Sequence, residues 1–280
     1  MNVIDMLYFL VCMLSSAIGA ISGIGGGVII KPVLDAVSTL EISAIHFLSG
    51  NVVLCMAVST LLRSRKSGVR IDRSTSAFLA VGACLGGVLG KQLFELMRGL
   101  FNTAQFLSIL QSALLLLINI VVFCYIGYKQ KIHTLHISSA FFCCLIGLFM
   151  GTLSAFLGIG GGPINIAVLS FFFSMKPKEA AFNSIYVIVF SQAASLLGTL
   201  CRGAVPAISM LTLVVMCLGG VCGSIVGSNI SKKLSDENVD RLFSILLIIL
   251  ILLNIYNIAR IQMTESLVAE SGGALQAVIF

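Results

Sequence analysis

The chain has 280 residues, of which 58% are hydrophobic and only 10% charged, and its mean hydropathy is +1.09. A soluble domain carries about 25% charged residues, so this composition excludes an ordinary soluble enzyme and predicts a protein embedded in a lipid bilayer. The net charge of +6 does not indicate nucleic-acid binding, because the basic residues fall between apolar blocks, where the positive-inside rule places them.

The apolar blocks follow one another with short polar breaks, and eight of them are long enough for a crossing, which needs about 20 residues. Met1–Asp5 has no basic flank before the first block, so no cleavable signal is expected. We predict an all-α polytopic membrane protein and a mobile tail over residues 261–280. The long blocks are residues 3–22, 43–62, 77–97, 105–128, 137–157, 180–200, 207–230 and 242–259, and the short ones are residues 28–38 and 163–174.

A glycine-rich motif occurs once in each half of the chain. Gly23-Ile24-Gly25-Gly26-Gly27 returns 135 positions later as Gly158-Ile159-Gly160-Gly161-Gly162. A second motif, residues 84–90, returns at nearly the same offset as residues 217–223. Two matches at one spacing indicate a duplicated unit. We therefore predict four long helices plus one short helix in each half, with repeat 1 over residues 1–130 and repeat 2 over residues 131–260.

The distribution of lysine and arginine predicts the topology. If each short segment counts as a crossing, twelve basic residues between the blocks share one face and three share the other; if it does not count, the division is nine to six. The first division obeys the positive-inside rule far better. It places both termini outside and makes the two halves run in opposite directions, as in the inverted repeats of transporters. The three residues on the minority face are Arg98, Arg202 and Arg260.

The glycine breaks predict a binding site within the membrane. Non-helical backbone is tolerated there only where protein or a water-filled cavity surrounds it, and glycine lets backbone approach a ligand closely. The short helices begin at Val28 and Pro163, and a helix start offers unpaired N–H groups and a positive dipole end. In an inverted pair both starts can face one site near the midplane. We predict a small-anion site lined by residues 23–31 and 158–166.

The alternative interpretation is that the glycines only allow tight helix packing, as small residues do in membranes. Duplication, the five-residue pattern and the short segments that follow favour a site for the runs at 23–27 and 158–162. The motifs at 84–90 and 217–223 have no short segment after them, and for these two we favour packing.

Polar side chains near the breaks complete the predicted site. An ionisable residue inside the membrane is a functional candidate, although Lys31 can equally form a neutral structural pair with Asp35 four residues later. The same spacing of Lys91 and Glu95, near the end of a block, favours a structural pair. Asparagine and serine side chains beside the breaks either donate to an oxyanion or join helices. The predicted substrate-binding residues are Gly23, Gly25, Gly26, Gly27, Val28, Lys31, Asn51, Gly158, Gly160, Gly161, Gly162, Asn165, Asn183 and Ser184, and Ser49, Ser191 and Gln192 are further candidate donors.

Other chemistry is not indicated. His133 and His136 share a basic loop without a third ligand, so we predict no metal site. No Ser/His/Asp or Cys/His constellation can be found, and the glycines before Lys91 lack the first glycine and the Ser/Thr of a phosphate-binding loop. We therefore expect no enzyme, no cofactor and transport driven by gradients.

At the glycine motifs the chain resembles the TauE/SafE sulfite exporter family, which carries a GxGGG motif followed by an apolar run with proline once in each half. Gly23–Gly27 with Pro32 matches the first copy, whereas in the second copy Ala167 stands where Pro32 aligns and Pro163 follows the glycines directly. The resemblance implies a permease of the cell (inner) membrane for sulfite, thiosulfate or organosulfonate-type anions. It leaves open the choice of anion, the direction, a proton as coupling ion and a homo-oligomeric state.

Two other function classes remain open from the sequence. One is an anion channel, and the other is a non-transporting membrane assembly or scaffold protein in which the glycines serve packing alone.

Overall fold

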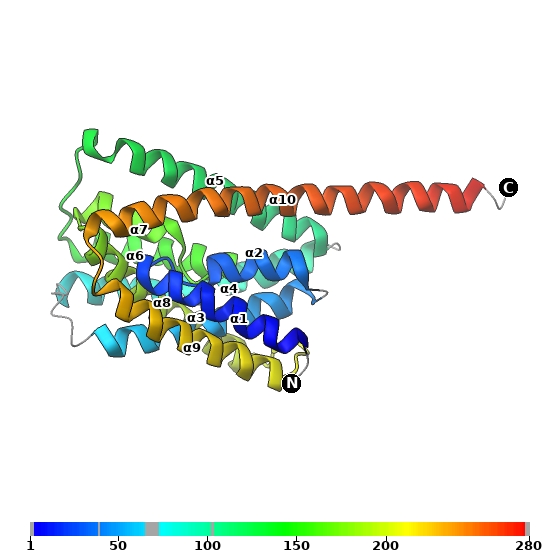
Figure 1. The fold of residues 1–280 in the computed structure, drawn as a ribbon, viewed down its shortest axis with the longest axis horizontal. Helices are drawn as coiled ribbons and strands as arrows, with labels where there is room; N and C mark the ends of the chain where they lie inside the picture. The colour runs from blue at the N-terminus through cyan, green and yellow to red at the C-terminus, as the bar shows by residue number, and fades with distance from the viewer. Residues whose placement is uncertain (1–2, 39, 65–72, 102–103, 278–280) are drawn as a thin grey trace.

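The computed structural model describes residues 3–38, 40–64, 73–101 and 104–277, and within these ranges the chain is helical without a strand. Eight helices are long and apolar enough to cross a membrane, which confirms the predicted all-α polytopic class (Figure 1). The helices are α1 Val3–Ser22, α2 Gly27–Val37, α3 Ile42–Ser64, α4 Arg73–Leu100, α5 Ala104–Tyr128, α6 Ala140–Leu157, α7 Pro163–Phe173, α8 Pro177–Cys201, α9 Met210–Ser231 and α10 Asp236–Ala277, with a 3-10 turn η1 at Lys129–Lys131.

Every predicted block forms a helix, and the differences lie at the ends. Helices α8 and α10 begin before their apolar blocks because their first turns carry helix-starting residues. Pro177 occupies the first turn of α8, where its missing N–H costs nothing. Asp236 and Glu237 start α10, where carboxylates favour the positive end of the helix dipole. At the other end, α10 continues as helix through the segment expected to be a tail and extends beyond the bundle (Figure 1).

Close helix contacts hold the bundle together at glycines. Helix α4 packs along α6, and α1 packs along α9. A side chain at Gly86 would overlap the backbone of Leu148 on α6, and one at Gly223 would overlap that of Met13 on α1. Small residues let helices approach in this way, and dispersion contacts then replace the hydrophobic effect that lipid removes. The packing interpretation of the motifs at 84–90 and 217–223 is thereby confirmed.

Successive helices run in alternate directions, and this includes the two short ones (Figure 1). At one end of the bundle Lys129 forms an ion pair with Asp240. At the other end Arg98 lies 3.8 Å from Glu41. Helices α2 and α7 both begin in the interior of the bundle and run toward opposite ends, so that α2 packs against α10 and α7 against α5.

The glycine contacts give a test of the packing. We expect Gly86→Val to destabilise the protein by about 1–3 kcal/mol, the cost of overpacking a tight contact. Gly127→Val is the matched control, because nothing lies within 4 Å of a Cβ at Gly127. Unfolding in mixed micelles would measure both, and equal stability of the two variants would contradict the close α4–α6 contact.

Candidate functional site

The two glycine breaks lie against each other inside the bundle. The Gly162 N–H donates a hydrogen bond to the Ile24 carbonyl oxygen at 2.9 Å. A Cβ placed at Gly25 would lie 3.3 Å from the Gly160 carbonyl oxygen. Two segments that are far apart in the sequence are therefore in direct contact, and α2 and α7 both begin at this junction.

The breaks share an unusual backbone conformation. The φ angle is +76° at Gly23 and +67° at Gly158, and it is +86° at Gly25 and +74° at Gly160. L-residues with side chains rarely adopt positive φ, whereas glycine does so at no steric cost. Glycine thus supplies the positive φ at the first and third positions of both copies of the motif, and the second copy continues it at Gly161 and Gly162.

Long helices α3 and α8 close around the junction. Val53 of α3 lies where side chains at Gly27 and Gly160 would project, and Ile188 of α8 lies beside Gly25 in the same manner. Val53 and Ile188 are themselves 135 positions apart. Both side chains are buried, so the junction is enclosed by one residue from each half.

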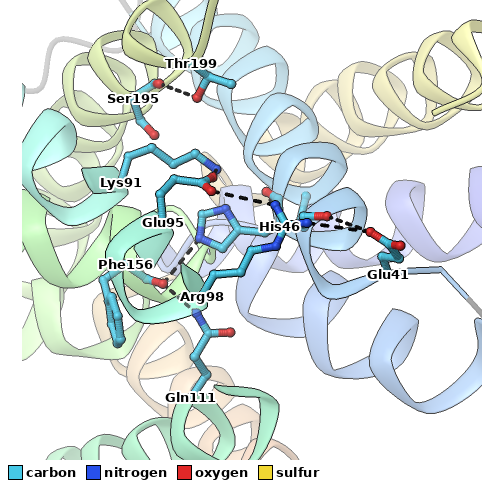
Figure 2. A network of polar contacts seen from close by, with 11 residues as sticks. Glu41, His46, Lys91, Glu95, Arg98, Gln111, Phe156, Ser195 and Thr199 are labelled. Atoms are coloured by element: carbon cyan, nitrogen blue, oxygen red, sulfur yellow. Dashed lines mark hydrogen bonds and ion pairs between the residues drawn. The ribbon is translucent and has the colours of Figure 1, made fainter. Parts of the chain in front are cut away.

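The end of α6 is held by side chains from other helices. The last carbonyl groups of a helix have no partner within it and need one elsewhere. The Ser49 hydroxyl donates to the Gly158 carbonyl oxygen at 2.7 Å. The Phe156 carbonyl oxygen accepts from Gln111 Nε2 at 2.7 Å and lies 3.3 Å from His46 Nε2 (Figure 2). Side chains of α3 and α5 thus satisfy the carbonyl groups that the second break leaves without a partner in α6.

A buried ammonium is tied into this arrangement. Lys31 of α2 is 1% exposed, and its Nζ donates to Gln111 Oε1. Gln111 Nε2 in turn donates to the Phe156 carbonyl oxygen. Asp35 instead lines an open hollow of about 260 Å³ together with Glu41 and residues of α5 and α10. In the described part of the chain Lys31 is thus hydrogen-bonded to α5, and no ion pair with Asp35 is found.

Several buried polar atoms around the junction have no hydrogen-bond partner in the described structure. Both amide atoms of Asn165 are unpaired, as is the Ser184 hydroxyl, and both side chains are fully buried. Asn165 lies in the first turn of α7, and its Nδ2 is 2.5 Å from the place of a Cβ at Gly161. Leaving such groups unpaired costs about 1–3 kcal/mol each. A ligand that hydrogen-bonds to them at the helix start would explain why they are present.

The remaining predicted residues lie in other surroundings. Asn183 accepts from the Ser76 hydroxyl at 2.7 Å and donates to the Glu179 carbonyl at 3.0 Å, which joins α8 to α4. Asn51 donates to the Phe47 carbonyl of its own helix at 2.8 Å and lines a small cavity beside α4 and α8.

Sequence reasoning did not select His46 or Gln111. The only available signal was a single polar residue within a long apolar block, and that signal does not reveal which way the residue faces. The pair predicted between Lys91 and Glu95 is present, with 3.0 Å between Nζ and Oε1.

Comparisons with known proteins find similarity to membrane transporters. A family model described as sulfite exporter TauE/SafE matches residues 8–253. The chain is 23% identical over 262 residues to the "Probable membrane transporter protein YunE" of Bacillus subtilis (strain 168), covering 85% of this chain and 92% of that protein. It is 28% identical over 202 residues to a "Probable membrane transporter protein" of Haemophilus influenzae (strain ATCC 51907 / DSM 11121 / KW20 / Rd), covering 69% and 71%. No solved structure matches it.

The Lys31–Gln111 connection gives a second test. Gln111→Leu would leave both the ammonium of Lys31 and the Phe156 carbonyl without this partner, so we expect a loss of about 3 kcal/mol in unfolding free energy. Adding Lys31→Met should restore the part of that loss that comes from the ammonium, because replacing both partners of the Lys31–Gln111 hydrogen bond by apolar groups is nearly neutral. Mixed-micelle unfolding of the two variants would decide, and an undiminished stability of Gln111→Leu would remove Gln111 from this role.

Proposed function

Because the chain belongs to the sulfite exporter TauE/SafE family of membrane transporters, we propose that it is a secondary transporter for a small sulfur-containing anion such as sulfite, thiosulfate or an organosulfonate. No ATP-binding motif is readable in the sequence, so gradients drive the transport in this proposal. The cell (inner) membrane is its proposed location.

The proposed binding site lies at the junction of the two glycine breaks, near the bilayer midplane. Helices α2 and α7 both begin there, and helix starts present N–H groups and a positive dipole end to an anion. The observation that carries the proposal is Asn165, whose buried amide has no hydrogen-bond partner in the described structure at this helix start. An oxyanion would accept from Nδ2, and Ser184 is positioned on the helix face that also carries Ala181 and Ile188 against the breaks.

The predicted substrate-binding residues divide into three roles in this proposal. The glycines and Val28 supply backbone, Asn165 and Ser184 supply side-chain donors, and Lys31 supplies positive charge from the second turn of α2. Asn183 is engaged with α4 and contributes to helix packing. Asn51 belongs to the neighbouring cavity.

We further propose that the two halves are inverted repeats over residues 1–130 and 131–260. The contact of α1 with α9 has its counterpart in that of α6 with α4, and the contact of α2 with α10 has its counterpart in that of α7 with α5. Helices α2 and α7 also run toward opposite ends (Figure 1). These features support an arrangement in which two related bundles rock around a fixed site.

A specific observation also favours the scaffold alternative. The breaks are tightly packed on each other, since a Cβ at Gly27 would overlap the Ile159 carbonyl. If the glycines served only this contact, the protein would need no ligand. A channel is the other alternative, and only a carrier exchanges labelled for unlabelled anion in counterflow.

A variant at Asn165 distinguishes a transporter with this site from a scaffold. We expect Asn165→Leu to raise the melting temperature, because it removes two unpaired buried polar atoms, while anion uptake falls at least tenfold. Uptake and counterflow in proteoliposomes, with sulfite, thiosulfate and taurine as a panel, would measure the loss.

The matched control for this experiment is Asn119→Leu. Asn119 of α5 is equally buried and also lacks a hydrogen-bond partner for both amide atoms in the described structure, but it is not at a break. It should show the stabilisation with wild-type uptake. Full uptake by Asn165→Leu would contradict the site, and no uptake of any anion by the wild-type protein would favour the scaffold.

The proposed orientation can be tested independently. With both termini outside, an alkaline phosphatase fused after residue 263 should be active, and a green fluorescent protein fused at the same position should stay dark. The reason is that twelve of the fifteen basic residues between the blocks would then face the cytoplasm. The reverse pattern of the two reporters would overturn the orientation without affecting the helix assignment.

A further inference from the structure

A small cavity between α3, α4 and α8 has the chemistry of an anion site. Its volume is about 20 Å³, roughly the room that one or two water molecules need. Every polar residue on its wall is a cation, a histidine, an amide or a hydroxyl, and none is acidic. The lining residues are His46, Phe47, Gly50, Asn51, Lys91, Gln192, Ser195, Leu196 and Thr199.

Lys91 supplies the positive charge. Its side chain is 4% exposed, and Nζ lies 3.0 Å from Glu95 Oε1. The ammonium also lies 4.9 Å from the ring centre of Phe94, which stacks on His46 at 4.1 Å. Figure 2 shows Lys91 between the Ser195–Thr199 turn of α8 and the His46 ring. An ammonium at this depth in an apolar bundle is expensive and is a functional candidate by default.

The carboxylate of Glu95, which pairs with Lys91, is shared with a second cation. Glu95 also lies 3.7 Å from Arg98. Arg98 is 3.8 Å from Glu41, but that carboxylate is 79% exposed and water screens it. Two cations thus share one partly buried carboxylate, so the group of Lys91, Glu95 and Arg98 carries a net positive formal charge.

The α8 wall adds neutral hydrogen-bonding groups. Gln192, Ser195 and Thr199 follow the spacing of one helix face. The Thr199 hydroxyl donates to the Ser195 carbonyl at 3.0 Å, and the Ser195 hydroxyl and the Lys91 ammonium are further donors carried by residues of the cavity wall. A cation with neutral donors recognises an anion, and the one acid beside this cation, Glu95, is not part of the cavity wall.

The cavity also adjoins the second glycine break. Gln192 Nε2 donates to the Ser154 hydroxyl at 3.2 Å, and Ser154 lies in the last turn of α6 before Gly158. On the other side, the His46 ring occupies the place into which a side chain at Gly158 would project. Two residues of the cavity wall, Gln192 and His46, therefore contact the segment that leads into the second break.

We propose that this cavity is a second anion subsite, which holds a compact inorganic oxyanion at Lys91 on its way to or from the junction. This inference rests on the proposed function and extends it. The volume has no room for an organic chain, and an ion of the size of sulfite enters only if the side chains of the wall move apart, so the ligand class is limited to compact oxyanions. A bound oxyanion replaces Glu95 as the counter-ion of Lys91, and Glu95 stays paired with Arg98.

The test compares Lys91→Met, Glu95→Gln and the double variant, with sulfite as the probe. We expect Lys91→Met to raise the KM for sulfite uptake at least tenfold. Glu95→Gln should lower the KM about threefold, because it removes the carboxylate that competes with the anion. The double variant should keep the raised KM although neither member of the Lys91–Glu95 pair is then left without the other. Lys129→Met is the control, because it breaks the Lys129–Asp240 ion pair away from any cavity described above and should leave the KM unchanged.

A purely structural ion pair gives the opposite pattern. Both single variants would then lose stability, and the double variant would recover wild-type stability and wild-type KM, which overturns the proposal. An unchanged KM for Lys91→Met overturns it as well.

Thermal stabilisation by sulfite in detergent separates this inference from the proposed function. If the wild-type protein transports no anion but is stabilised by sulfite, and Lys91→Met is not, the transport function fails and the subsite stands. If transport is intact and Lys91→Met is stabilised by sulfite like the wild type, the subsite fails and the proposed function stands.

Discussion

The structure depends on how two broken helices satisfy their backbone inside a lipid environment. An unpaired N–H or C=O costs several kcal/mol there, and each glycine break exposes several. The Gly162 N–H donates to the Ile24 carbonyl and so pairs one group from each break. Side chains of α3 and α5 donate to carbonyl groups at the end of α6. Each break therefore requires the other, and this mutual requirement holds the starts of α2 and α7 together.

The same requirement explains why polar side chains gather in the interior. Gln111 connects the Lys31 ammonium to the Phe156 carbonyl, and His46 lies against that carbonyl from α3. Once such groups are buried, each needs partners, because low surrounding polarity strengthens both satisfied and unsatisfied interactions. The result is a connected set of polar groups that reaches from α2 past the second break to the cavity at Lys91. Asn165 and Ser184 stay without a hydrogen-bond partner in the described structure, and Asn165 is the one of these two that lies at a helix start.

The sequence predicts the frame well because the bilayer imposes simple rules. Block length and glycine position determine where helices begin and end, and the repeat of the glycine motif predicts which segments are equivalent. The sequence does not predict which neighbouring helix a single polar residue faces. Gln111 and Asn183 both look like isolated polar residues in apolar blocks, yet one supports the second break and the other joins α8 to α4. Helical periodicity cannot separate these cases when lipid and protein interior are equally apolar, because the hydrophobic pattern then no longer distinguishes inside from outside.

The two halves of the chain have the glycine motif and the order of helices in common, but they differ in the polar residues beside the breaks. At the offset of the glycine motif, Lys31 corresponds to Ile166 and His46 to Ala181, while Asn165 corresponds to Ile30. Gly161 and Gly162 have positive φ, whereas their counterparts Gly26 and Gly27 do not. The buried positive charges thus lie in the first half, and the unpaired donor at a helix start lies in the second. If the two halves are repeats, as we propose, the different residues at equivalent positions would let one half supply charge and the other supply directed hydrogen bonds. An anion held between them would contact both halves, which is the condition for its binding to be coupled to their relative movement.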